Sequence, residues 1–146
     1  MSSSRPYELR PISSQGGVMK RILVVEDSRL VSELLRVELG KRGFEVTVRD
    51  DGLEGLKTAK EILPDLVILD VMLPSMNGFK ICRLLKFDKR FKNIPVIMLT
   101  TRSLEDDKKI GITSGADAYM AKPFRVEDLV ARMEELMAVE SGAEGR

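Results

Sequence analysis

The stretch that decides the fold is Leu66-Val67-Ile68-Leu69-Asp70, four aliphatic residues closed by a carboxylate. It follows a break at Pro64-Asp65 and precedes a loop, residues 71–78, that contains Pro74 and Gly78. A continuous aliphatic run between turn signals predicts a strand buried on both faces. An aspartate that ends such a strand could simply cap the next loop. Alternatively, it is delivered into the ligand crevice at the carboxyl ends of parallel strands. The rest of the chain decides between these interpretations.

Four other short apolar runs have the character of strands, and they are residues 22–25, 44–48, 95–100 and 118–121. Apolar residues at helical spacing lie between and after the strands, at 30–39, 53–59, 79–85 and 126–137. Ser103, with Asp106 three positions later, has the pattern of a capping box and predicts a further helix that ends near residues 111–115. Five strands that alternate with helices predict a parallel sheet covered on both faces.

Composition excludes several classes of protein. At 146 residues, with 43% hydrophobic and 32% charged residues, the chain has ordinary globular usage rather than that of a disordered protein. A net charge of +1 with both signs interspersed gives no footprint for direct nucleic-acid binding. No apolar run predicts membrane insertion or a signal peptide, so we expect a cytoplasmic protein. The lone Cys82 fits a reducing compartment, and its apolar helical surroundings place it in the core.

The periodic pattern also delimits one domain. Residues 1–19 are rich in Ser, Pro and Gly and predict a flexible N-terminal extension. The regular pattern predicts a single domain over residues 20–139. Residues 140–146 are expected to form a flexible tail.

The chain contains no histidine. This excludes Ser-His-Asp and Cys-His catalysis and any histidine-ligated metal site. The remaining options for chemistry are carboxylates, lysine, hydroxyls and a hard cation.

Polar side chains end four of the predicted strands, and they are Glu26 with Asp27, Asp70, Thr100 and Lys122. The carboxyl ends of parallel strands face one edge, so these side chains can converge. Three adjacent carboxylates would raise each other's pKa unless a cation lay among them. Oxygen ligands with room for water suit Mg²⁺, with Mn²⁺ as the alternative. Asp70 would then be a nucleophile toward phosphorus, assisted by the lysine and the threonine.

Residues 20–138 resemble the receiver domain of two-component response regulators, close to the stand-alone chemotaxis type. The motifs that carry the resemblance are Glu26-Asp27, Asp70 with Pro74 and Asn77-Gly78, Leu99-Thr100, Gly115-Ala116-Asp117 and Lys122-Pro123-Phe124. The resemblance implies an α/β, flavodoxin-like, doubly wound sheet of five parallel strands with five flanking helices. It also implies a signalling domain rather than an enzyme, with slow self-phosphorylation and self-dephosphorylation. A sensor histidine kinase or a phosphotransfer protein would supply the phosphoryl group to Asp70.

The same resemblance assigns a role to each site residue. Glu26, Asp27 and Asp70 are expected to bind the metal, together with the backbone carbonyl of Met72. Thr100 and Lys122 are expected to contact the phosphoryl group.

The resemblance further implies a cis Lys122-Pro123 peptide and a switch in which Thr100 and Tyr119 respond to phosphorylation. The signal is expected to emerge on the fourth helix, the fifth strand and the fifth helix, where a downstream protein or a second copy of the chain would bind. Thr101 is slightly larger than the small residue usual at this position.

Two alternatives stay open at this stage. The chain could be the receiver fragment of a larger response regulator. A phosphatase-type enzyme also uses an aspartyl phosphate, but it needs a second aspartate two residues after the nucleophile, where this chain has Met72.

Overall fold

The sheet is built from short aliphatic strands. The computed structural model describes residues 19–100 and 115–145. Its strands are β1 (Arg21–Val25), β2 (Glu45–Arg49), β3 (Leu66–Asp70), β4 (Val96–Thr100) and β5 (Ala118–Ala121). Every residue of β3 and β4 is buried, whereas β2 is half-buried along its whole length. The continuous apolar runs therefore form the central strands, and the alternating run forms an edge.

All neighbouring strands pair in parallel, in the order β2-β1-β3-β4-β5. This is the flavodoxin-like order, and it confirms the predicted fold class. From β1 the chain first moves outward to β2 and then returns to β3 on the other side. The carboxyl ends of β1 and β3 are therefore neighbours at the point where the strand order reverses, which is where such sheets bind ligands.

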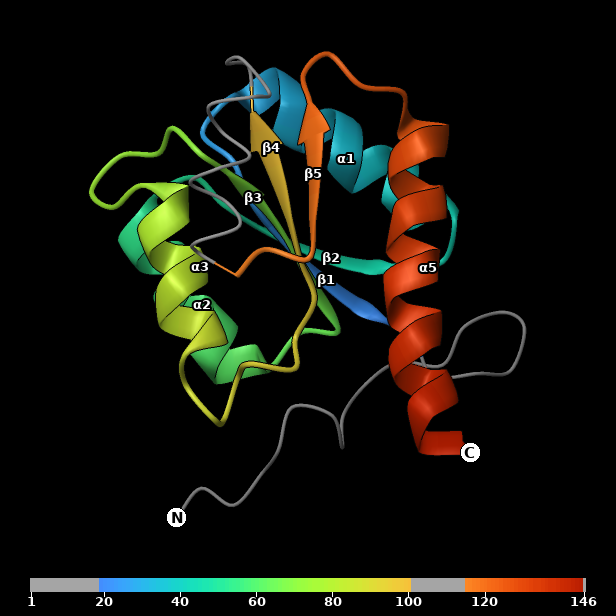
Figure 1. Ribbon diagram of the computed structural model, residues 1–146. Coiled ribbons are helices and arrows are strands. Elements are labelled where there is room, and N and C mark those ends of the chain that lie inside the picture. The colour runs from blue at the N-terminus through green and yellow to red at the C-terminus, as the bar shows by residue number, and fades with distance from the viewer. Residues whose placement is uncertain (1–18, 101–114, 146) are drawn as a thin grey trace.

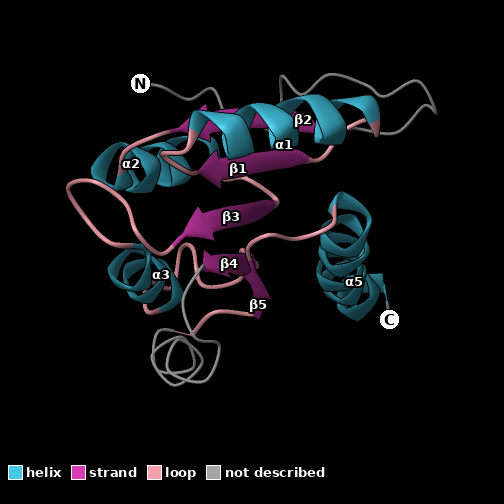
Figure 2. Cartoon of the chain, turned by 90° about the horizontal axis from the view of Figure 1, so that it is seen from above, coloured by secondary structure: helices cyan, strands magenta, loops and turns pink. Residues whose placement is uncertain are grey.

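Helices cover both faces of the sheet, as Figures 1 and 2 show. The described residues contain α1 (Arg29–Lys41), α2 (Gly52–Ile62), α3 (Gly78–Lys86) and α5 (Val126–Gly145). Side chains of α1 and α5 pack on one face, and those of α2 and α3 pack on the other. The helix predicted to begin at Ser103 falls outside the described residues, as do most of the predicted N-terminal extension and Thr101. No described helix is long and apolar enough to cross a membrane.

Short polar side chains start the first three helices. Ser28, Asp51 and Asn77 each accept a hydrogen bond from the backbone N–H three residues later, which is the usual N-cap arrangement. Such caps fix where each helix leaves the loop at the carboxyl edge of the sheet. The loops that surround the candidate site are therefore anchored at their helical ends.

The structure differs from the sequence expectations at two helices. Helix α5 continues to Gly145, whereas the sequence analysis ends the regular pattern at residue 139. No proline interrupts residues 140–145, so the backbone can continue the helix into the segment for which a flexible tail was expected. In α1, Leu30 belongs to the predicted apolar stripe but is 84% exposed. The buried face of α1 is narrower and is formed by Ser32, Leu35 and Leu39.

The core has two halves, one on each face of the sheet. Cys82 lies in the half beneath α2 and α3 and is fully buried, as its helical surroundings predicted. The end of the sheet opposite the candidate site is held by a polar tie to Lys86, the last residue of α3. Its Nζ lies 2.7 Å from Oδ2 of Asp117 and donates to the carbonyls of Lys92 and Ile94. Oδ2 of Asp117 also accepts from the N–H of Val96, so the starts of β4 and β5 are joined to α3.

We predict that Lys86→Met lowers the free energy of unfolding by about 2 kcal/mol, because it leaves the carbonyls of Lys92 and Ile94 and the Asp117 carboxylate without their common donor. The matched control is Lys89→Met, at an exposed position of the same segment. This control should change the free energy of unfolding by less than about 0.5 kcal/mol. Urea denaturation of both variants measures the difference, and equal stabilities would contradict a structural role for this tie.

Candidate functional site

Three carboxylates from two adjacent strand ends meet at the carboxyl edge of the sheet. Glu26 and Asp27 follow β1 directly, and Asp70 is the last residue of β3. One oxygen of each lies within 4.8 Å of the other two. Glu26 and Asp70 are buried, at 1% and 5% exposure, whereas Asp27 is exposed. The convergence expected from the strand ends is therefore present.

Lys122 brings a positive charge to this cluster from the end of β5. Its Nζ lies 2.8 Å from Oε1 of Glu26 and 3.5 Å from Oδ1 of Asp70. The shorter contact has the distance of an ion pair but not the geometry of a hydrogen bond. Among the described residues, Oε1 of Glu26 therefore has no hydrogen-bond donor. The sequence analysis assigned Lys122 to a phosphoryl group, and in the structure the lysine lies closest to Glu26.

The donor set fits a hard divalent cation. All three side-chain ligands are oxygens, one of them is buried without a hydrogen-bond donor, and one ammonium cannot neutralise three carboxylates. Mg²⁺ and Mn²⁺ are the cations that such a set of oxygens selects. Glu26, Asp27 and Asp70 are thus the candidate metal ligands, as the sequence analysis proposed.

The pKa of Asp70 is raised from 3.8 to about 6. Burial is the largest cause and the charge of Glu26 is the second, while Lys122 and the N–H of Met72 act in the opposite direction. Mutual repulsion, the cause of a raised pKa that the sequence analysis named, is therefore present but secondary to the loss of water around Asp70. A cation bound beside the carboxylate would lower this pKa again.

The loop that follows Asp70 stays close to the sheet. The N–H of Val71 donates to Leu99, the N–H of Gly78 donates to Val71, and the N–H of Met72 reaches Oδ1 of Asp70 at 3.4 Å. A Cβ atom at Gly78 would overlap the carbonyl oxygen of Asp70, so the close return of the loop requires glycine. Met72 is thereby held next to the carboxylates, with its side chain 56% exposed.

Comparison with known families identifies this arrangement. Residues 22–134 match the family described as the response regulator receiver domain. The chain belongs to this family. The resemblance inferred from the sequence motifs is therefore confirmed, and with it the assignment of this receiver domain to two-component signalling proteins.

The chain spans about half the length of the curated relatives it matches. It is 42% identical over 119 residues to the DNA-binding dual master transcriptional regulator RpaA of Synechocystis sp.. The matched region covers 82% of this chain and 49% of that relative. It is 44% identical over 114 residues to the DNA-binding response regulator MtrA of Mycobacterium tuberculosis, covering 78% of this chain and 49% of the relative. Both matches lie within the part that this chain shares with longer regulators.

Solved receiver structures agree with the fold. A putative response regulator from Chloroflexus aurantiacus has a TM-score of 0.78 at 34% identity, covering 82% of this chain and 98% of its own. The receiver domain of the sensor histidine kinase PA1611 from Pseudomonas aeruginosa has a TM-score of 0.77 at 26% identity, covering 83% and 99%. That second structure contains a magnesium ion coordinated in its active-site cleft.

Thr100 and Lys122 extend the receiver site across β4 and β5. Thr100 ends β4, is 1% exposed and lies opposite Ala121 in the sheet register. Its carbonyl accepts a hydrogen bond from the N–H of Lys122 at 2.8 Å. The Lys122-Pro123 peptide is cis, as the resemblance implied. Tyr119 lies opposite Met98, is half-buried and packs against the core half under α2 and α3.

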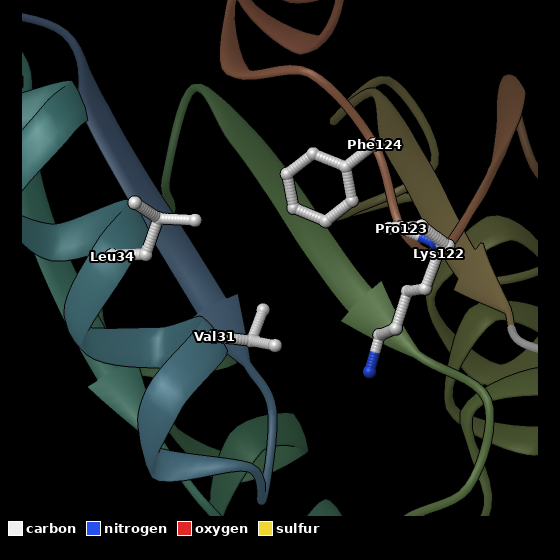
Figure 3. Close-up of a pocket in the computed structure, with 5 residues that line it drawn as sticks. All are labelled: Val31, Leu34, Lys122, Pro123 and Phe124. Carbon is white, nitrogen blue, oxygen red and sulfur yellow. The ribbon is translucent and has the colours of Figure 1, made fainter.

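An apolar groove of about 300 Å³ lies beside Lys122. Figure 3 shows Val31 and Leu34 of α1 on one side and Pro123 and Phe124, after β5, on the other. The aliphatic stem of Lys122 lines the groove, while its ammonium points away from Phe124 toward the end of β3. The lysine thus buries its stem in apolar surroundings and keeps its charge among the carboxylates.

Ser28 is a site residue that the sequence analysis did not single out. Its N–H donates to Oε2 of Glu26 at 2.9 Å, and its hydroxyl caps α1. A serine immediately before an amphipathic helical run is a recognisable capping signal. That signal marks the start of α1 but not the bond to Glu26, because the backbone N–H of Ser28 makes that bond.

We predict that Asp70→Asn stabilises the metal-free receiver at pH 7.5 by up to about 3 kcal/mol, because it removes a buried charge that a pKa near 6 disfavours. Between pH 4 and 6, native Asp70 holds its proton more tightly than unfolded Asp70, so wild-type stability falls as the pH rises. The advantage of the variant should be complete above about pH 6 and vanish near pH 4.

Urea denaturation in EDTA at several pH values measures this difference. Asp88→Asn is the control, because Arg90 holds the pKa of Asp88 at about 2 and removing that carboxylate should bring no gain. A gain for Asp70→Asn that persisted at pH 4 would contradict the electrostatic explanation.

Proposed function

We propose that this receiver accepts a phosphoryl group on Asp70, with Mg²⁺ held by Glu26, Asp27, Asp70 and the backbone carbonyl of Met72. The observation that carries the proposal is the meeting of three carboxylates and Lys122 at one buried strand edge. The magnesium in the PA1611 receiver supports the choice of metal. When bound, the ion would supply positive charge that the site lacks. Mn²⁺ is the expected substitute.

The proposed step is a displacement at phosphorus. A carboxylate oxygen of Asp70 forms the new P–O bond, while the bond between phosphorus and the donor breaks and its electron pair leaves with the donor. With a phosphohistidine donor, the leaving group is an imidazole. These 146 residues contain no histidine, so the proposed donor is a phosphohistidine outside them, on a sensor histidine kinase or a phosphotransfer protein, or a small acyl phosphate.

Lys122 and Thr100 have distinct proposed tasks. The Lys122 ammonium, 3.5 Å from Asp70, is placed to pair with an oxygen of the incoming phosphoryl group. Thr100, on the adjacent strand end, can donate its hydroxyl to another of these oxygens. Both residues are proposed to bind phosphoryl oxygens, and the chain is proposed to act as a signalling domain rather than as an enzyme. Slow self-phosphorylation and self-dephosphorylation stay predictions.

The signal would leave the site through Thr100 and Tyr119. A threonine drawn toward the phosphoryl group vacates space near β5, and Tyr119 could rotate inward to fill it, since packed interiors do not leave such gaps. The surface that changes would include β5 and α5, where a downstream protein or a second copy of the chain would bind. The fourth helix of that surface, with Lys108 and Lys109, lies outside the described residues.

Two expectations about the wider protein stay predictions. We expect no direct nucleic-acid contact from the residues of this chain, since their charges are balanced and interspersed. This expectation does not extend to a longer protein, because the relatives that the chain matches over about half their length are DNA-binding regulators. A larger regulator that contains this receiver could bind DNA through further residues. The cytoplasmic location, expected from the lone Cys82 and from the absence of a predicted signal peptide, also stays a prediction.

We predict that acetyl phosphate with Mg²⁺ adds one phosphoryl group to the wild-type protein, that the label is labile like other acyl phosphates, and that Asp70→Asn abolishes it. An amide oxygen is a poor nucleophile, so the loss should be complete. Asp88→Asn, an aspartate change in an exposed loop, is the matched control and should label normally. Intact-protein mass spectrometry measures the addition, and stoichiometric labelling of Asp70→Asn would overturn the proposal.

We predict that Thr100→Ala still accepts the phosphoryl group on Asp70 but uncouples it from the surface of β5 and α5. In the wild type, backbone amide NMR shifts on phosphorylation should extend to residues 118–137. In Thr100→Ala they should shrink to the loops around Asp70. Identical shift patterns in the two proteins would exclude Thr100 as the link to Tyr119.

A further inference from the structure

The first turn of α2 is packed against the strand that carries two of the carboxylates. A Cβ atom at Gly55 would lie 2.6 Å from Cγ1 of Val25, so only glycine allows α2 to approach β1 this closely. Val25 is the last residue of β1 and directly precedes Glu26 and Asp27. The position of this turn and the position of the two carboxylates are therefore coupled through the close packing of Gly55 on the Val25 side chain.

The same turn holds the tip of the loop that carries Met72. The N–H of Gly52 donates to the carbonyl of Pro74 at 2.9 Å, and a Cβ atom at Gly52 would overlap the carbonyl oxygen of Met76. Asp51 caps α2 with Oδ2 and accepts a hydrogen bond from the Ser75 hydroxyl with Oδ1. Three consecutive loop residues thus contact the beginning of α2.

We propose that the first turn of α2, residues 51–55, is a positioning element that sets the distance between the carboxylates on β1 and the Met72 carbonyl. The inference rests on the proposed metal site. It identifies the segment that keeps the Met72 carbonyl at the correct distance from Glu26 and Asp27. The base of the loop is fixed to the sheet through Val71 and Gly78. With the base fixed, the contacts at the tip determine where residue 72 lies.

The rival explanation is that the turn only fills space. In that case, disturbing it would lower the stability of the fold but leave the affinity of the folded protein for Mg²⁺ unchanged. A positioning role predicts instead that the Mg²⁺ affinity of the folded protein changes. The site of the folded variant would bind Mg²⁺ more weakly, and excess Mg²⁺ would restore phosphoryl acceptance.

The main experiment compares Gly52→Ala with Gly40→Ala. A Cβ atom at Gly40 meets nothing within 4 Å, so this change introduces a methyl group into a helix without touching the site. Isothermal titration with MgCl₂ measures the affinity of each protein. We expect Gly52→Ala to weaken binding about tenfold, the lower end of what loss of support around metal ligands causes. Gly40→Ala should stay within about twofold of wild type, because it changes only helix propensity.

A milder variant keeps the test informative if Gly52→Ala does not fold. Ser75 has φ of 62°, a left-handed conformation that glycine adopts without strain. Ser75→Gly therefore allows the same backbone conformation and removes the side chain whose hydroxyl donates a hydrogen bond to Asp51, and we expect it to weaken Mg²⁺ binding about threefold. Ser75→Asn, which tolerates the same φ and offers an amide donor, should restore the wild-type affinity.

Labelling by acetyl phosphate gives the second readout. In Gly52→Ala and Ser75→Gly, the Mg²⁺ concentration for half-maximal labelling should rise in step with the titrated affinity, while the rate at saturating Mg²⁺ stays near that of wild type. If these variants bind Mg²⁺ as tightly as Gly40→Ala and wild type do, the positioning role is wrong and the metal site stands. If wild type itself neither binds Mg²⁺ nor labels on Asp70, the metal site and its positioning element both fall.

Discussion

The candidate site depends on holding three carboxylates, Glu26, Asp27 and Asp70, close together at a partly buried edge of the sheet. Two of the three carboxylates at the sheet edge are buried, and among the described residues the ammonium of Lys122 is the positive charge that lies beside them. Such an arrangement is unfavourable in isolation, since a desolvated charge needs a partner. The fold sustains it because β3 and β4 are buried along their whole length and cannot move their ends into solvent. Burial of the central strands therefore provides the favourable free energy that offsets the electrostatic cost of the site.

The sequence predicted the fold and the carboxylate cluster for the same physical reason. Strand order follows from alternating strands and helices, and parallel strands bring Glu26, Asp27 and Asp70 to one edge whatever the loops do. What the sequence could not give is which partner each side chain selects. Lys122 lies nearer to Glu26 than to Asp70, a difference of 0.7 Å between the distances of 2.8 and 3.5 Å that depends on side-chain packing.

Contacts between segments far apart in the chain were also beyond sequence reasoning. Asp51 and Ser75 are 24 residues apart, and neither belongs to an apolar run or to a strand end. The exposure of Leu30 illustrates the same limit, because helical spacing marks an apolar stripe but not its width. The width depends on how α1 sits over the sheet. By contrast, the burial of Cys82 was predictable, since its neighbours on α3 are apolar on the same face.

The differing environments of the three carboxylates explain why Asp70 is the proposed acceptor. Glu26 has one oxygen bonded to the N–H of Ser28, and its other oxygen, which pairs with Lys122 and has no hydrogen-bond donor among the described residues, is the one proposed for the metal. Asp27 is exposed, and water stabilises its charge. Burial gives Asp70 a pKa of about 6, which leaves it ionised at neutral pH but more basic than an ordinary aspartate. Phosphorylation would add negative charge and place it on the phosphoryl oxygens, so the proposed step depends on Lys122, 3.5 Å from Asp70, and on a bound cation to balance that charge.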